Sequence, residues 1–410
     1  MLAVTTHAFF TRMGMSVAVK PIQSEFGLSN LEVGWVLSAF ILGYGVVQLP
    51  VGVLTDRMGP HRLLALSLFL WSALHGLTAL AQQLSWPPYW SVLQALMVVR
   101  FVMGVAQATV LPCANKTIAR WMAPDERASA NALSMMGLGI GGGITPPLTV
   151  ALIVLYGWQA PFLIAAVVGV ALSAFWLWFG RNTPEEHPQV SQGELAHIRG
   201  APKAAVALRT PTPWRALLTN RSTWCLALSY GMAGYPSYVF FTWFYLYLVN
   251  ARNVDVRAGG YWSALPYLAI ATMVPLGGRL SDWLSIRWGK RRGRLSVVLF
   301  GALTASALIV IGSRLEDARA AVVLLSIGAG FHLFAQTPSW AASIDLAPSH
   351  SATLFAIMNT MAQAIGAAAP VLTPLIAERF GWNSALDFAA FMAAMAGVFW
   401  IFVRPEKPLG

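Results

Sequence analysis

Two arginines lie inside apolar stretches of this 410-residue chain, where a charged side chain needs a partner or a function. Arg12 and Arg100 are well within such stretches, whereas all sixteen Asp and Glu residues fall in connections or near the ends of the stretches. A charge at the centre of a bilayer costs at least about 2.5–3.5 kcal/mol, so such residues face a protein interior or a pathway. A guanidinium group binds a carboxylate through two parallel hydrogen bonds. We therefore expect the pair to bind an organic anion; the alternative for Arg100 is a structural or relay role.

Three histidines, His7, His75 and His332, also lie in apolar stretches and are able to carry a proton near neutral pH. A single histidine on an apolar helix is more often a hydrogen-bonded structural residue than a relay. His332 is the preferred exception, because Gln336 and Trp340 follow at i+4 and i+8 and share its helix face. We predict that His332 is a coupling residue and that Gln336 and Trp340 line a binding site.

The elements that position these residues are expected to be membrane-spanning helices. Hydrophobic residues make up 57% of the chain and charged residues only 10%, against about 25% charged in soluble domains. Lipid as the solvent tolerates this composition, provided that each span satisfies its own backbone hydrogen bonds. We predict an all-α membrane protein. Its twelve helices are expected at residues 2–20, 31–54, 63–82, 90–113, 128–155, 158–180, 222–249, 259–281, 295–313, 318–340, 351–377 and 382–403.

The basic residues outside these helices are distributed unequally across the membrane. Nineteen Lys and Arg residues fall in the connections on one side, and six fall on the other. The positive-inside rule places both termini and the long middle connection in the cytoplasm, and the chain in the inner membrane. The net charge of +11 is therefore a consequence of topology rather than a sign of nucleic-acid binding.

One long polar connection, residues 181–221, divides the chain into two halves of six helices, residues 1–180 and 222–410. Matching dipeptides recur 224 residues apart at corresponding helix ends: Gly157-Trp158 with Gly381-Trp382, and Ala123-Pro124 with Ala347-Pro348. An even number of helices in each half gives parallel repeats, an arrangement typical of carriers with a midplane site and alternating access. A channel is disfavoured because no filter-like loop is apparent.

A motif of glycine and charged residues follows the second predicted helix and recurs in degenerate form after the eighth. Its copies are Gly52-Val-Leu-Thr-Asp56-Arg57-Met-Gly59-Pro-His-Arg62, and Gly278-Arg-Leu-Ser-Asp282 with Gly289-Lys290-Arg291-Arg292. The motif resembles the loop signature of the major facilitator superfamily. Glycine lets two helices approach, while Asp and Arg at helix ends pair across them. The resemblance implies that Asp56, Arg57, Arg62 and Asp282 are gating residues; the alternative is a static turn.

Within that superfamily the chain resembles the anion:cation symporter group, which includes bacterial sugar-acid permeases and organic-anion carriers. The resemblance rests on Arg12-Met-Gly-Met-Ser-Val-Ala-Val, Arg100-Phe-Val-Met-Gly104, Phe241-Thr-Trp243-Phe-Tyr-Leu-Tyr247-Leu and Ala356-Ile-Met-Asn359. It implies that Arg12, Tyr44, Tyr238 and Asn359 contact the substrate. For the two tyrosines the alternative is a packing or interfacial role, and for Asn359 it is an interhelical hydrogen bond.

Two positions depart from the pattern of proton-coupled members of that group. An acidic residue commonly precedes the first-helix arginine, and another follows the fourth-helix arginine by seven residues. Here these positions hold Thr11 and Gln107, which are able to bond a substrate but carry no proton near pH 7. Three modes therefore stay open: uniport, exchange, or proton movement through a histidine.

The leading interpretation is a secondary transporter of a small organic anion of the carboxylate or sugar-acid type. The alternative is an exporter of larger amphipathic compounds, with Phe240, Phe241, Trp243 and Trp340 as its binding surface. A membrane sensor is disfavoured because no sizeable soluble domain is apparent. No nucleophile–base set or metal-ligand spacing stands out, so we expect no enzyme activity, no cofactor and no metal. We expect the protein to function as a monomer, with lipid and its substrate as its partners.

The predicted topology is tested with a cysteine placed at Gln192, in a chain whose Cys113 and Cys225 are replaced by alanine. Because the middle connection is expected in the cytoplasm, this cysteine should not react with a membrane-impermeant maleimide in intact cells. Permeabilised cells are the control and should show full labelling. Ready labelling in intact cells would place the middle connection outside the cytoplasm and contradict the predicted orientation.

Overall fold

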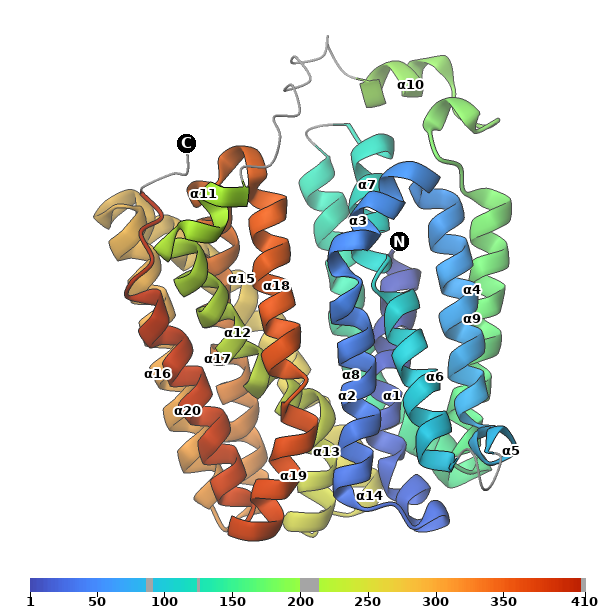
Figure 1. Ribbon diagram of the computed structural model, residues 1–410, viewed down its shortest axis with the longest axis vertical. Coiled ribbons are helices and arrows are strands. Elements are labelled where there is room, and N and C mark those ends of the chain that lie inside the picture. The colour runs from blue at the N-terminus through green and yellow to red at the C-terminus, as the bar shows by residue number, and fades with distance from the viewer. Residues whose placement is uncertain (86–90, 124–125, 200–213, 407–410) are drawn as a thin grey trace.

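The described helices form two bundles that lie side by side. The computed structural model describes residues 1–85, 91–123, 126–199 and 214–406. Within these ranges every regular element is helical. Figure 1 shows helices α1–α9 in one bundle and α12–α20 in the other, with α10 beyond one end of the first bundle. The all-α architecture predicted from composition is thus confirmed.

The first bundle contains the helices that hold both buried arginines. Its elements are α1 (Leu2–Phe26), α2 (Asn30–Val46), α3 (Gln48–Met58), α4 (Pro60–Thr78), α5 (Ala81–Leu84), α6 (Val92–Gln107), α7 (Val110–Trp121), α8 (Arg127–Tyr156) and α9 (Gln159–Phe179). The connection that follows contains the short elements η1 (Pro184–Glu186), α10 (Gln192–Arg199) and α11 (Trp214–Thr219).

The second bundle, like the first, contains both long continuous helices and spans that are divided into consecutive shorter helices. Its elements are α12 (Arg221–Thr242), α13 (Phe244–Leu246), η2 (Tyr247–Ala251), α14 (Val256–Trp262), α15 (Leu265–Trp288), α16 (Lys290–Arg314), α17 (Ala318–Leu346), η3 (Pro348–His350), α18 (Ser351–Gly366), α19 (Ala369–Phe380) and α20 (Trp382–Trp400). Each of the twelve predicted spans corresponds to one helix or to consecutive helices of this series.

Seven of the described helical segments are long and apolar enough to cross a membrane, and α2 is a shorter apolar helix. The remaining spans are less apolar: α1, for example, carries Arg12 and Lys20. The observed helices also extend past several predicted ends, as α1 does to Phe26 and α17 to Leu346. These extensions include charged and polar residues, such as Glu25 and Asp345, which lower their hydrophobicity. The chain is a multi-pass membrane protein.

The two bundles meet mainly at the end away from the middle connection. Contacts join α2 with α18 and α19, α8 with α14 and α15, and α1 with α12 and α13. Figure 1 shows α13, α14 and α19 close to the first bundle, at the end opposite α10. The first two sets are equivalent to each other, because α2 corresponds to α14–α15 and α8 corresponds to α18–α19 in the repeat, so a pseudo-symmetric seam closes this end.

Backbone groups of a broken helix form one side of that seam. Pro370 lacks an N–H, and α18 and α19 are separated just before it. At this break the N–H of Val371 bonds the carbonyl oxygen of Ala368, and the carbonyl oxygen of Ala367 accepts a hydrogen bond from Oγ of Ser38 on α2, at 2.6 Å. A Cβ added to Gly34 on the same helix would lie 2.3 Å from the carbonyl oxygen of Pro370. Only glycine at residue 34 permits this approach.

Replacing Gly34 by valine should force this end of the seam open. The reporter is a cysteine at Ser38, which is only 1% exposed, in a chain whose Cys113 and Cys225 are replaced by alanine. A local opening that becomes more favourable by about 1.4 kcal/mol raises the reactivity of a buried thiol roughly tenfold. The measurement is the rate of labelling by a soluble maleimide.

The matched control for this experiment is Gly139→Val, because a Cβ added to Gly139 meets nothing within 4 Å. This control should leave the reactivity of the Ser38 cysteine unchanged. Equal labelling rates in the Gly34 and Gly139 variants would contradict the assignment of Gly34 to the closing contact.

Candidate functional site

The polar centre of the first bundle depends on a close contact between α2 and α6. A Cβ added to Gly43 would lie 2.1 Å from the carbonyl oxygen of Phe101, and one added to Gly104 would lie 2.2 Å from that of Phe40. The two backbones therefore touch at both glycines. This contact brings the ring of Phe40 on α2 against the side chain of Arg100 on α6, with their centres 4.7 Å apart.

Arg12 is surrounded by aromatic rings from both halves. Its Cζ lies 5.1 Å from the ring centre of Tyr44, 5.3 Å from Phe40, 5.5 Å from Tyr238 and 5.6 Å from Phe9. Ring faces carry partial negative charge and stabilise a cation where water is scarce. The side chain is half-buried, and its Nε has no hydrogen-bond partner among the described residues.

Arg100 lies behind Arg12 and is 1% exposed. Its Nη2 donates to the carbonyl oxygen of Arg12 at 3.4 Å, and its Nη1 lies 3.5 Å from the sulfur of Met103. Its Nε is also without a partner among the described residues. The two guanidinium groups thus share the ring of Phe40, and no ion pair of either is found in the described part of the chain. The site carries two positive charges that lack a counter-ion.

Thr11 and Gln107 meet next to the arginines. Nε2 of Gln107 donates to Oγ1 of Thr11 at 3.2 Å and to the carbonyl oxygen of Ala8 at 3.0 Å. The Thr11 hydroxyl in turn donates within α1, to the carbonyl oxygens of His7 and Ala8. Thr11 is fully buried and Gln107 is 3% exposed. The structure therefore brings them together as a neutral bridge between α1 and α6.

Tyr238 connects the first half to α18 of the second. Nη2 of Arg12 donates to its hydroxyl, which donates to Oε1 of Gln363 at 2.6 Å. Nε2 of Gln363 lies 3.4 Å from Oδ1 of Asn359, one turn earlier on the helix. Gln363 was not identified from the sequence. The signal available there was a second amide four residues after Asn359 in an apolar helix.

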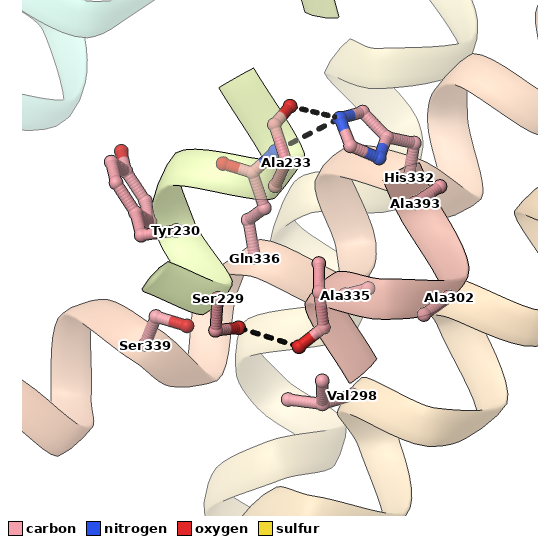
Figure 2. Close-up of a pocket in the computed structure, with 11 residues that line it drawn as sticks. Ser229, Tyr230, Ala233, Val298, Ala302, His332, Ala335, Gln336, Ser339 and Ala393 are labelled. Atoms are coloured by element: carbon pink, nitrogen blue, oxygen red, sulfur yellow. Dashed lines mark hydrogen bonds between the residues drawn. The ribbon is translucent and has the colours of Figure 1, made fainter. Parts of the chain in front are cut away.

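The second bundle holds a separate polar cluster around His332. Its Nε2 lies 2.9 Å from the carbonyl oxygen of Ala233, 3.0 Å from Oγ of Ser237 and 3.0 Å from Nε2 of Gln336. Figure 2 shows the imidazole and the Gln336 amide meeting beside Ala233 at the edge of a small cavity. A single imidazole nitrogen donates to the carbonyl in one tautomer and accepts from Gln336 in the other. The bonds formed here thus depend on where the proton lies.

Trp340 follows His332 and Gln336 on α17 and contacts a residue of α12. Its Nε1 donates to the hydroxyl of Tyr230 at 3.1 Å, and the indole is 39% exposed. Tyr230 also lies within electrostatic range of Tyr44 and Tyr238. Tyr230 was missed in the sequence, because nothing in the apolar pattern of α12 indicates which of its residues faces inward.

The other two histidines are held inside the first bundle. His7 accepts a hydrogen bond from Nε1 of Trp71 at 3.3 Å, and its Nε2 lies 2.9 Å from the carbonyl oxygen of Ala165. His75 packs against the ring of Phe162, with centres 4.8 Å apart. His7 is therefore an interhelical hydrogen-bonding residue.

The predicted gating residues are at the end that carries the middle connection. Arg57, Arg62 and Asp282 are exposed, and no ion pair joins them to one another or to other described residues. The side chain of Asp56 lies outside the described part of the structure. Asp345, one of the described carboxylates at this end, binds Lys290 at 2.8 Å and Arg294 at 2.5 Å. Glu126 and Glu185 at the same end pair with His197 and Arg199 of the middle connection.

The aromatic residues considered for an exporter are mostly packed. Trp243 is 1% exposed and donates to the carbonyl oxygen of Pro370 at 3.1 Å, while Phe240 packs on Phe244. Phe241 stacks on Tyr267 beside a small cavity between the halves. Of the four residues, Trp340 is the one with substantial exposure. Among the described residues, no group of three or more His, Cys, Asp or Glu side chains is placed to hold a metal ion.

Comparison with protein-family models identifies one relationship that spans most of the chain. A model described as the Major Facilitator Superfamily matches residues 1–370. A solved structure also matches: the bacterial homologue of the human lysosomal transporter Spinster, in an inward-facing and unoccupied conformation. It aligns with a TM-score of 0.81 at 17% sequence identity, covering 98% of this chain and 95% of that one. This likeness confirms the predicted twelve-helix fold.

Several curated proteins are similar over nearly the whole chain. A probable sulfoacetate transporter of Cupriavidus necator is 31% identical over 382 residues, which cover 91% of this chain and 85% of the relative. A probable L-galactonate transporter of Escherichia coli is 28% identical, covering 96% and 86%. A probable galactarate/D-glucarate transporter of Bacillus subtilis is 28% identical, covering 96% and 88%.

Proposed function

Because this chain belongs to the Major Facilitator Superfamily, we propose that it is a secondary transporter that moves a small organic anion by alternating access. The observation that carries the proposal is the pair of guanidinium groups on either side of Phe40, neither of which has a described carboxylate partner. An anion at this place supplies the missing countercharge. Relatives named as carriers of sulfoacetate, L-galactonate and glucarate support the same substrate class.

The proposed substrate site lies between the halves and draws on both. Arg12 and Arg100 hold a carboxylate, with Thr11 and Gln107 fixing the helices on which they stand. Tyr44 and Asn359 supply hydroxyl and amide groups of the kind that hydrogen-bond the hydroxyls of a sugar acid. Tyr238, whose hydroxyl accepts from Arg12 in the structure, lies where the carboxylate of the substrate would approach that arginine. Gln336 and Trp340 reach the site from the second half, through the contact of Trp340 with Tyr230.

The moving units in this proposal are residues 1–180 and 222–410, joined by residues 181–221. We place both termini and the middle connection in the cytoplasm of a cell whose inner membrane holds the protein, from the distribution of basic residues. The seam closed by Gly34 and Ser38 then faces the opposite side. Arg57, Arg62, Asp56 and Asp282 retain their proposed gating role, in a state that brings the cytoplasmic ends together.

The exporter alternative has less support. Three of its four proposed contact residues, Phe240, Phe241 and Trp243, pack against neighbouring side chains or the backbone. A large amphipathic compound needs a wide apolar surface, and these rings are already covered. In that alternative the two arginines are structural residues, and their lack of a described carboxylate partner stays unexplained.

Loss of either arginine should weaken anion binding. Arg12→Gln and Arg100→Gln each remove a charged hydrogen-bond donor, at a cost of about 1.5–3 kcal/mol, or roughly ten- to hundredfold in Kd. Arg12→Lys should also be impaired, because an ammonium group does not reproduce the planar fork. The measurement is binding and proteoliposome uptake of sulfoacetate, L-galactonate and D-glucarate.

Asp282→Asn is the control for the arginine variants, since a gating residue affects rate rather than affinity. This variant should slow transport and leave the Kd within a few-fold of the unmodified protein. If both arginine variants bind the acids as tightly as the unmodified protein, the organic-anion site is wrong. If Asp282→Asn transports at the normal rate, its gating role is wrong.

Proton coupling through Thr11 and Gln107 should be absent. Any acceleration of uptake by an imposed pH gradient should therefore not arise at these two positions, and Thr11→Asp or Gln107→Glu should introduce or strengthen it. Uptake into proteoliposomes with an alkaline interior measures this. Strong acceleration in the unmodified protein that His332→Gln abolishes would assign the proton to His332, whose bonds depend on its tautomer. Strong acceleration that survives this change would contradict both assignments.

A further inference from the structure

The hydroxyl of Tyr238 has both of its hydrogen-bonding roles occupied, and the two partners belong to different halves. It accepts from Nη2 of Arg12 on α1 and donates to Oε1 of Gln363 on α18. A phenol has a single proton to donate. With that proton committed to Gln363, the oxygen presents its lone pairs to the guanidinium group. Gln363 therefore sets the direction in which Tyr238 accepts.

Gln363 is held firmly enough to perform this orientation. Its side chain is 8% exposed, and its Nε2 lies within hydrogen-bonding distance of Oδ1 of Asn359. A Cβ added to Gly45 on α2 would lie 2.9 Å from the Cβ of Gln363. The residue is thus wedged into the seam between the two halves.

We propose that Tyr238, oriented by Gln363, is the ligand of Arg12 in the empty carrier and is displaced by the substrate carboxylate. This inference rests on the proposed function of Arg12 as an anion-binding residue. A carboxylate carries the countercharge and accepts two parallel hydrogen bonds from a guanidinium group, whereas the phenol is a single neutral acceptor, so the carboxylate replaces the phenol. Displacement removes a bond between the halves. Occupancy and the freedom of the halves to move are then linked, and the linkage acts in both directions.

The first experiment measures the link in the empty carrier, without any substrate. Spin labels are placed at Met136 on α8 and Ile344 on α17, both exposed and near the ends that carry the middle connection. Double electron–electron resonance then gives the populations of conformations with these ends apart and together. Tyr238→Phe should shift their ratio roughly tenfold away from the conformation described here, because one charged hydrogen bond is lost.

Tyr235→Phe is the matched control on the same helix. The Tyr235 hydroxyl is also buried, but it bonds Oγ1 of Thr373 at 3.2 Å, within the second half. Its removal should leave the ratio unchanged. Gln363→Leu should shift the ratio in the same direction as Tyr238→Phe, because the phenol then loses its acceptor on α18. Identical distributions for the Tyr238 and Tyr235 variants would overturn the link.

The second experiment tests displacement, with sulfoacetate and L-galactonate as probes in isothermal titration calorimetry. Tyr238→Phe should bind at least one probe several-fold more tightly, since the competing ligand of Arg12 is gone. Weaker binding would show that Tyr238 contacts the substrate, and would overturn displacement. Unchanged binding by Arg12→Gln would overturn the proposed site while the resonance result stands. If neither probe binds the unmodified protein, displacement falls together with the substrate class, and the resonance data alone decide the link.

Discussion

Two like charges buried beside each other in a membrane protein have to be stabilised by something other than water. In this protein the ring of Phe40 lies against both guanidinium groups, and three further rings lie around Arg12. The carbonyl oxygen of Arg12 accepts one hydrogen bond from Arg100. The arrangement is possible because Gly43 and Gly104 let α2 and α6 touch. The stabilisation is incomplete, because Nε of each arginine has no partner among the described residues, and this is the basis of the proposed affinity for an anion.

The same requirement explains why the second half participates in the site. Tyr238 and Gln363 bring neutral oxygen atoms across the seam to Arg12, so the positive charge of the first half is partly satisfied by the second. The seam itself is closed further along by α2 against α19 and by α8 against α14 and α15. The residues of the proposed binding site and the residues of the closing contact therefore lie on neighbouring stretches of the same helices, as on α2. A displacement of the binding residues therefore reaches the closing contacts through only a few turns of helix.

Hydrophobicity and charge placement predicted the helices, the repeat and the buried arginines, since each depends on residues that are local in sequence. The contacts that complete the site are not local. Gln363 matters because of Tyr238, which is 125 residues away, and Tyr230 matters because of Trp340, which is 110 residues away. In helices that are apolar all round, periodicity does not reveal the inward face. For that reason Trp243, considered as a surface for large compounds, proved to be buried against Pro370.

The break between α18 and α19 has a consequence for genetics. The second half contributes main-chain carbonyls of Ala367 and Pro370 to the closing contact, whereas the first half contributes the side chain of Ser38 and the missing side chain of Gly34. Exchanging the side chain of Ala367 leaves its carbonyl in place. Heritable variation that tunes this closure accordingly acts through α2 far more readily than through α19. Both α2 and the break between α18 and α19 form the contact, but substitutions in α2 alter it more directly.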